Sequence, residues 1–243
     1  MKLLRFNIPK SKLDAIPENE QVFFIQLTHF LNELNILQKC VIISSNGMAS
    51  LNTVERRGQV SQAQFFIRTL AGKLNEGWKM LKKDFFNTHL SKKYEKVLSQ
   101  VGKDSLSELK RYFSRKNNIN LIRKKFAFHY DTEKIKEEIG KIPQSEALEM
   151  FISEHRGNCL YSLSDVIANW AILHCIDPSN PQRAMEILID EVAMKVSGWF
   201  QEFGGNCISI VVEKLGLDYT EIEVSEPPLI DDVRLPYFVK KTE

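Results

Sequence analysis

The sequence predicts an all-α protein, an antiparallel helical bundle with an extended C-terminal tail. Apolar residues recur at spacings of three and four along several long segments, which is the pattern of helices that bury one face. The pattern stops after Gly216, where apolar and polar residues alternate and Pro227 and Pro228 exclude a helix. We therefore expect a helical bundle domain over residues 1–216 and an extended tail over residues 217–243 that packs on the bundle or on a partner.

Two long helices are expected first. One begins after Pro17 and ends near Ser44, and a polar loop over about 46–58 separates it from a second helix over roughly 59–83. The apolar positions that follow the helical spacing are Phe23, Leu27, Phe30, Leu34, Leu37 and Val41 in the first, and Ala63, Ile67, Leu70, Leu74, Trp78 and Leu81 in the second. Because short connections favour antiparallel neighbours, the two helices are expected to run antiparallel.

The rest of the bundle is expected to be built from shorter helices and two longer amphipathic segments. These lie near 91–101, 104–115, 118–129 and 132–140, and then around 160–170 and 188–210. Asp104 and Asp131 stand where helix N-caps are expected. Gly204 and Gly205 interrupt the last segment without a preceding strand or a following Lys-Ser/Thr, so we interpret them as a kink or a close helix contact rather than a phosphate loop.

The charge balance disfavours a general affinity for nucleic acid or acidic membranes. The chain has 33 Lys and Arg against 31 Asp and Glu, a net charge of +2, so any basic surface must be local. No segment reaches the roughly 18 apolar residues of a membrane span, and the N-terminus lacks the apolar run of a signal peptide. We expect a cytoplasmic protein that does not associate with membranes.

Metal ions and cofactors are not expected. Cys40, Cys159, Cys175 and Cys207 form no Cys-x-x-Cys pair, which disfavours a zinc knuckle and a thioredoxin-like redox site. The paired Glu-x-x-His motifs of di-iron bundles are also missing. We interpret the four cysteines as reduced, packed thiols.

Residues 123–131, with the sequence RKKFAFHYD, carry side chains suited to phosphate chemistry. Arginine holds phosphate oxygens through a planar, charged fork, and histidine exchanges a proton near neutral pH. Arg123 and His129 together can bind an RNA phosphodiester and assist attack of the ribose 2'-hydroxyl on it, without a metal. On an α-helix, however, these two residues lie about 120° apart. The alternative is a solvated basic face of Arg123, Lys124 and Lys125, with His129 capping the helix or bonding a backbone carbonyl.

Residues 122–131 resemble the motif of the HEPN superfamily, helical-bundle domains with an Arg followed by four to six residues and a His in a late helix. The stretch is similar to the RN...AFHYD form of uncharacterised bacterial members, and the likeness in architecture covers roughly 18–215. In active relatives this pair serves metal-independent RNA cleavage, often across a dimer. The resemblance therefore implies a homodimer in which Arg123 binds phosphate and His129 transfers a proton. Lys124 departs from the Asn, Asp or His usual in active members, and many members are non-catalytic binding modules.

Two further groups of polar residues are candidates for RNA contacts. His155 and Arg156 either face the basic stretch and bind RNA together with Lys124 and Lys125, or belong to a helix terminus. Lysine clusters on two other helices are either solvated faces or an extension of an RNA surface with nearby aromatic rings: Lys79, Lys82, Lys83, Lys92, Lys93 and Lys96, with Trp78, Phe85 and Tyr94.

Two functions follow from these observations. The first is an RNA-binding module or metal-independent endoribonuclease of a defence or toxin system, with RNA as its partner. The second is a non-catalytic protein-interaction or dimerisation domain, in which His129 is buried and bonded to the backbone. Whether the protein is an enzyme depends on which of the two holds.

Overall fold

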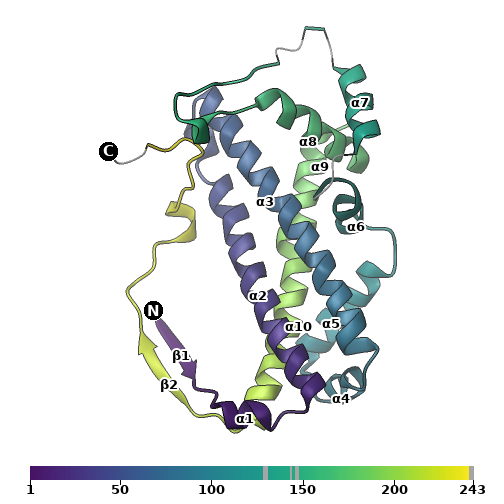
Figure 1. The fold of residues 1–243 in the computed structure, drawn as a ribbon, viewed down its shortest axis with the longest axis vertical. Helices are drawn as coiled ribbons and strands as arrows, with labels where there is room; N and C mark the ends of the chain where they lie inside the picture. The colour runs from purple at the N-terminus through teal and green to yellow at the C-terminus, as the bar shows by residue number, and fades with distance from the viewer. Residues whose placement is uncertain (128–130, 143, 146–147, 241–243) are drawn as a thin grey trace. The chain divides into compact units, whose positions relative to one another are not determined.

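The computed structural model describes residues 1–127, 131–142, 144–145 and 148–240. Helices account for most of these residues, which confirms the predicted all-α class (Figure 1). A length of apolar helix sufficient for a membrane span is not found in these ranges. The chain groups into two compact units: unit 1 is Met1–Asn35, Lys73–Lys116 and Lys195–Leu229, and unit 2 is Ile36–Gly72, Asn117–Met194 and Ile230–Glu243.

Unit 1 is built from helices around an aromatic core. Its helical segments are α1 (Lys10–Asp14), the first part of α2 (Glu18–Ser45), the end of α3 (Thr53–Met80), the π-helical η2 (Leu81–Phe86), α4 (Leu90–Val97), α5 (Gln100–Phe113) and α10 (Ser197–Lys214). The ring of Phe85 stacks on Phe23 and meets Phe203 edge-on, at centroid distances of 5.2 and 5.3 Å. All three rings are buried, so they form the centre of this core.

Within unit 1, α2 and α3 run antiparallel, as the sequence predicted. Lys73 Nζ of α3 lies 2.8 Å from Glu33 Oε2 of α2. Four residues further along α3, Gly77 lies against the ring of Phe30, which is three residues earlier on α2. The contacts move toward the C-terminus of α3 as they move toward the N-terminus of α2, so the two helices run in opposite directions.

Gly204 in α10 is a close helix contact, one of the two interpretations that the sequence allowed. A Cβ at this position would lie 2.6 Å from Leu31 Cδ1 of α2, so the two helices approach where a side chain is missing. A Cβ at the neighbouring Gly205 would meet nothing within 4 Å. α10 runs through both glycines, and its backbone N–H groups there are used within the helix rather than for a phosphate.

Unit 1 also contains a two-stranded antiparallel sheet formed by β1 (Lys2–Phe6) and β2 (Tyr219–Glu223), with Leu4 opposite Glu221. β2 is the part of the tail where apolar and polar residues alternate. Every residue of the two strands except Ile222 is exposed. The sheet therefore has two uncovered faces in the described part of the chain.

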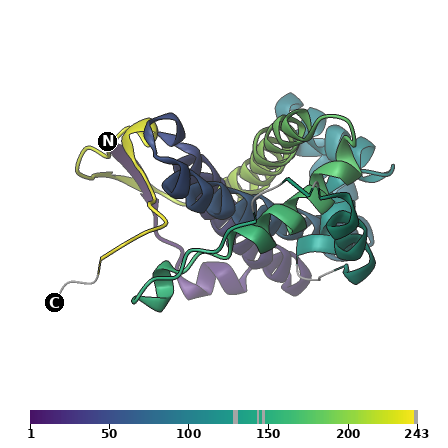
Figure 2. The ribbon, with the colours of Figure 1, turned by 90° about the horizontal axis from the view of Figure 1, so that it is seen from above.

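Unit 2 contains the end of α2, the start of α3 and the helices that carry the predicted site. Its other helical segments are η1 (Met48–Ser50), α6 (Asn118–Ile122), η3 (Arg123–Ala127), α7 (Thr132–Lys141), η4 (Arg156–Asn158), α8 (Ser162–Ile176), α9 (Pro181–Leu188), η5 (Ile189–Val196) and η6 (Ile230–Asp232). Of these, η3 and η5 are π-helical. α7 packs against α8 and α8 against α9, which can be followed in Figures 1 and 2.

α3 begins at Thr53, several residues earlier than the sequence predicted and inside the expected loop. Asn52 Oδ1 accepts a hydrogen bond from Glu55 N at 2.9 Å, and Glu55 Oε2 accepts one from Asn52 N at 3.2 Å. This reciprocal pair satisfies two of the N–H groups that a helix start leaves without partners. The polar residues after Asn52 are therefore an exposed first turn of a helix, not a loop.

α5 also begins earlier than predicted, and the predicted cap was wrong. Ser99 Oγ accepts a hydrogen bond from Gly102 N at 3.2 Å, so the helix starts at Gln100. Asp104 consequently lies inside α5, where its carboxylate accepts a hydrogen bond from the Gln100 side chain at 2.7 Å. Serine and aspartate are both favoured at helix N-caps, and the local sequence does not show which of Ser99 and Asp104 is the cap.

The end of the tail packs on helices of unit 2. The side chain of Asn46 donates hydrogen bonds to Ile230 O and Val233 O, and Tyr237 Oη donates one to Cys159 O at 2.7 Å. The backbone of Gly58 in α3 lies against the Tyr237 ring. These contacts involve residues 230–239 of the tail.

Candidate functional site

The basic stretch begins in a π-helical turn rather than in the single α-helix that the sequence predicted over 118–129. η3 carries Arg123 and Lys125, which are half-buried, and Lys124, which is exposed. A π-helix is wound more widely than an α-helix, so the angular separation expected on an α-helix does not apply here, and such turns are frequent at functional sites. His129 lies outside the described residues, and its pairing with Arg123 stays a prediction.

The second candidate cluster is in another part of unit 2. His155 and Arg156 are exposed at the short helix η4, and His155 N donates to Ser153 Oγ at 3.2 Å. Two residues after Arg156, the side chain of Asn158 donates a hydrogen bond to Val239 O of the tail at 2.7 Å. Figures 1 and 2 both show η4 apart from α6, which leads into η3, so the described residues of the two candidate clusters are not brought together.

Asp131 joins the basic stretch to α7. Its Oδ1 accepts a hydrogen bond from Lys134 N at 3.1 Å, which confirms the predicted N-cap. Its Oδ2 lies 3.5 Å from Lys125 Nζ. The hydrogen bond from Lys134 N and the Lys125 ammonium group both lower the pKa of this carboxyl.

Beside this junction, α7 and α8 line a pocket of about 480 Å³ that the sequence did not predict. Its lining residues are Lys134, Glu137, Glu138, Lys141, His174, Cys175 and Pro178. Glu138 is only 1% exposed, and its Oε2 lies 2.6 Å from His174 Nδ1. Its other oxygen accepts a hydrogen bond from Lys141 Nζ at 2.9 Å. A buried carboxylate thus holds a histidine ring at the wall of a polar pocket.

His174 has the arrangement of a general base. Because Nδ1 faces the Glu138 carboxylate, the neutral ring carries its proton there, and Nε2 is the nitrogen left to accept another. The His174 side chain is 21% exposed, so a molecule bound in the pocket can reach it. The ring of Trp170, at a centroid distance of 5.9 Å, packs near the imidazole.

The lysines around the pocket are paired with carboxylates. Glu137 accepts hydrogen bonds from Lys134 and Lys141, and the two ammonium groups lower its pKa to about 2. Burial raises the pKa of the Cys175 thiol, and Lys134 and Lys125 lie near enough to oppose that shift. Lys125 of the basic stretch and the pocket therefore belong to one polar region.

Compared with protein-family models, with curated proteins and with solved structures, the chain gives no match. The chemistry of the His174 pocket is therefore argued from the residues that line it. Among the described residues, no three His, Cys, Asp or Glu side chains gather as ligands for a metal ion. The pocket offers a candidate proton acceptor, His174, the two ammonium groups of Lys134 and Lys141, and a volume large enough for a small ligand.

One residue in the sequence, Glu138, could have indicated this pocket, but it stands where the helical pattern leads one to expect an apolar residue. Glu138 is the buried position of α7, where a carboxylate replaces the expected apolar residue. A buried carboxylate requires a partner, but 36 residues separate it from His174. Only the packing of α7 on α8 identifies that partner.

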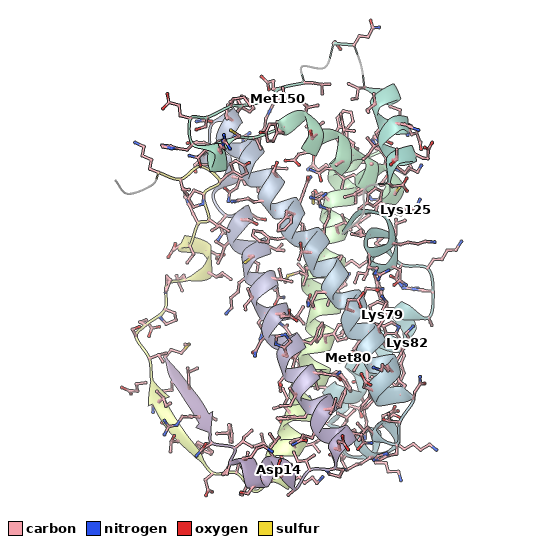
Figure 3. All side chains as sticks on the ribbon, viewed as in Figure 1. Asp14, Lys79, Met80, Lys82, Lys125 and Met150 are labelled. Atoms are coloured by element: carbon pink, nitrogen blue, oxygen red, sulfur yellow. The ribbon has the colours of Figure 1, made fainter. Side chains whose placement is uncertain are left out.

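Two of the three aromatic rings near the other lysine clusters are buried. Phe85 and Tyr94 are buried, and Trp78 stacks on the ring of Phe113 at 4.8 Å. Figure 3 labels Lys79 and Lys82, which lie close to the end of α3. Phe85 and Tyr94 belong to the core of unit 1 and therefore cannot extend an RNA surface, which was one of the two interpretations of these lysine clusters.

Proposed function

We propose that this chain is an RNA-directed protein of HEPN-like character that cleaves or binds RNA without a metal, with His174 as the proton acceptor. The proposal rests on the pair of His174 Nδ1 and Glu138 Oε2, 2.6 Å apart, in a pocket next to the basic stretch. A buried carboxylate that orients a histidine is the usual support of a general base. Arg123 and His129 keep their proposed roles in phosphate binding and proton transfer.

The proposed reaction is attack of a ribose 2'-hydroxyl on the adjacent phosphodiester. His174 Nε2 takes the proton of the 2'-hydroxyl while its oxygen forms a bond to phosphorus. The bond between phosphorus and the 5'-oxygen breaks, and that oxygen receives a proton from a second acid, the role proposed for His129. The products are a 2',3'-cyclic phosphate and a free 5'-hydroxyl. The proposed reaction uses neither a metal ion nor an oxidant.

The charges around the pocket predict salt-sensitive binding. Glu137 and Glu138 offset the two lysines that line it, Lys134 and Lys141. Beside the pocket Asp131 faces Lys125, and the exposed Lys124 of the basic stretch adds positive charge. A phosphate that enters must compete with those carboxylates for the lysines. Only a few positive charges therefore contribute to phosphate binding, and the affinity of the protein for RNA should fall as the salt concentration rises.

The test is incubation of purified protein with total RNA at about 50 and about 200 mM salt. His174→Gln removes the proton acceptor and is expected to slow cleavage by about 10²- to 10⁴-fold. His129→Ala tests the second role. His29→Gln is the matched control, because His29 Nε2 lies 3.7 Å from Glu33 on an exposed helix face.

Equal cleavage by His174→Gln and the unchanged protein would remove His174 from the mechanism. RNA binding without cleavage would leave a binding module, and no binding at either salt concentration would overturn the RNA proposal.

A second candidate function, protein interaction through the β1–β2 sheet, is favoured by the exposure of that sheet. Two strands alone are marginally stable in water and leave two unpaired edges. Leu4 is 55% and Tyr219 57% exposed, so apolar side chains accompany these edges. A second copy that adds its own strand would pair with one of these edges, which agrees with the homodimer implied by the resemblance.

Sedimentation of the protein and of Leu4→Glu tests this candidate. The substitution is expected to shift a dimer toward monomer, whereas Ile152→Glu, at a position that is 71% exposed outside the sheet, should leave the dimer unchanged. A monomer in the unchanged protein would exclude self-association, and a dimer that resists Leu4→Glu would exclude this sheet as its interface.

A further inference from the structure

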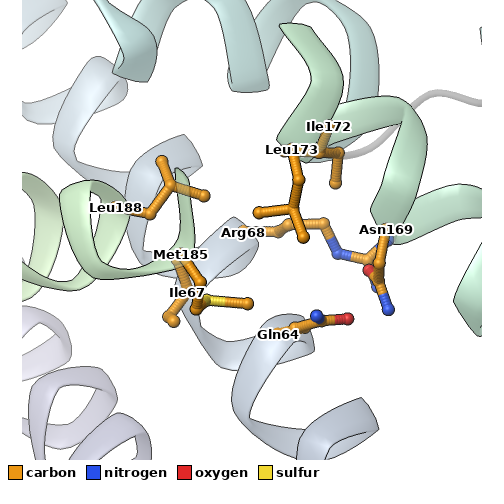
Figure 4. A pocket seen from close by; sticks show the side chains of 8 residues that line it. All are labelled: Gln64, Ile67, Arg68, Asn169, Ile172, Leu173, Met185 and Leu188. Carbon is orange, nitrogen blue, oxygen red and sulfur yellow. The ribbon is translucent and has the colours of Figure 1, made fainter. Parts of the chain in front are cut away.

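A second pocket in unit 2 lies between the first half of α3 and α8, and its chemistry differs from that of the His174 pocket. It has a volume of about 350 Å³, at the lower end of the range for small-molecule sites. Gln64 of α3 and Asn169 of α8 line it, together with Trp170. Gln64 and Asn169 also line a second, apolar cavity, which is shown in Figure 4.

Two residues that line this pocket carry buried carboxamide oxygens without partners. Gln64 is 9% and Asn169 7% exposed, and within the described residues neither Gln64 Oε1 nor Asn169 Oδ1 accepts a hydrogen bond. Figure 4 shows both side chains pointing toward the space between α3 and α8, with Arg68 extending in the direction of Asn169. A buried polar group without a partner is costly, so two such oxygens at one pocket indicate a ligand that donates hydrogen bonds.

The walls of the pocket favour a flat ligand. The indole of Trp170 provides an aromatic surface on which a planar ring can stack, and Val60 and Val166 add apolar contacts. A carboxamide combines one acceptor with two donors, which matches the edge of a base that carries an amine beside a ring nitrogen. The volume accommodates a single base or nucleoside.

We propose that this pocket binds a nucleobase with an exocyclic amine, such as adenine, through Gln64 and Asn169 with the ring against Trp170. The amine donates to the carboxamide oxygens, and the carboxamide nitrogens donate to ring nitrogens of the base. The base can belong to a free nucleoside or to an unpaired position of an RNA. Binding of the free nucleoside does not require that the chain cleave RNA.

Calorimetric titration of the full chain with adenosine and with purine riboside tests the proposal, because the two ligands differ only in the exocyclic amine. Adenosine is expected to bind at least about tenfold more tightly. Titration with AMP and with a short adenosine-rich oligoribonucleotide then separates a free nucleotide from an unpaired RNA base. No binding of adenosine or of the oligoribonucleotide up to about 1 mM would overturn the proposal, and so would equal affinity for adenosine and purine riboside.

Substitutions give a second readout. Asn169→Leu and Gln64→Leu remove the oxygens and are expected to weaken adenosine binding about tenfold or more while the protein stays folded in thermal denaturation. Gln62→Leu is the matched control, because Gln62 Oε1 is a buried oxygen without a partner on the same helix but outside the pocket lining. The same loss of binding in all three variants would overturn the assignment to this pocket.

Discussion

The buried carboxylate of Glu20 accepts a hydrogen bond of 2.8 Å from the hydroxyl of Tyr94. Its other oxygen lies 2.7 Å from Lys93 Nζ and 3.1 Å from Lys214 Nζ. Residues from α2, α4 and α10 thus meet at a single charge, and the four side chains fasten three helices of unit 1 together. Burial of a charge is costly unless it is paired and hydrogen-bonded, so each of these contacts matters to stability.

Tyr94→Phe is expected to lower the free energy of unfolding by about 1.5–3 kcal/mol, because it removes a hydrogen bond to a buried charge and leaves the ring in place. Chemical denaturation measures the change. Tyr161→Phe is the control, since Tyr161 is 55% exposed and should change stability by less than about 0.5 kcal/mol. Equal effects of the two substitutions would contradict the role assigned to the Tyr94 hydroxyl.

Acid should weaken the same site. Burial alone would raise the pKa of Glu20, but the hydrogen bonds from Lys93, Tyr94 and Lys214 outweigh it and lower the pKa below the usual 4.5. Ionised Glu20 therefore stabilises the folded state above pH 4.5, and this contribution is lost as the pH falls through the lowered pKa. Denaturation midpoints measured between about pH 7 and pH 3 should fall less steeply for Glu20→Gln than for the unchanged protein. If the midpoints of the two proteins fall equally steeply with pH, a carboxyl group other than Glu20 causes the loss of stability in acid.

The adjacent glycines of α10 should respond in opposite directions to alanine. Gly204→Ala forces a methyl group against Leu31 and is expected to destabilise by about 1–3 kcal/mol. Gly205→Ala meets nothing within 4 Å and is expected to stabilise by about 0.5–1 kcal/mol through helix propensity. Thermal unfolding of both variants measures the difference. Stabilisation by both would mean that the two helices do not approach closely at Gly204.

The start of α5 can be tested by removal of its cap. Ser99→Ala is expected to cost about 1 kcal/mol, because Gly102 N loses its partner. Ser107→Ala serves as the control, since Ser107 is exposed inside the helix, where alanine is the better helix former. Urea denaturation distinguishes the two. A neutral Ser99→Ala would place the start of the helix elsewhere.

If the chain binds RNA through its basic stretch, Lys124→Ala should weaken binding to all single-stranded sequences alike. The slope of log affinity against log salt should fall by about 0.7 for one lost phosphate contact. Lys10→Ala, on the exposed α1 and paired with Asp14, should leave the slope unchanged. Fluorescence anisotropy at several salt concentrations measures both, and an unchanged slope for Lys124→Ala would remove this residue from the RNA contact.

The sequence predicted the helical class, the antiparallel pair of α2 and α3 and the cap of α7, because local patterns carry these features. Apolar spacing identifies a buried face wherever that face packs. Asp131 caps α7 through an atom three residues away, which is local chemistry. Helix starts were less certain, as Asn52 and Ser99 show, because several residues in a polar segment are competent caps and only one is used.

Both candidate pockets, by contrast, were decided by tertiary structure. His174 and Glu138 are 36 residues apart, and Gln64 and Asn169 are more than a hundred apart, so no local spacing connects them. A sequence establishes which face of a helix is apolar, but burial of a polar side chain depends on which helix covers it. The basic stretch was visible in the sequence because its residues are consecutive, whereas the groups beside it came together only when α7 packed on α8.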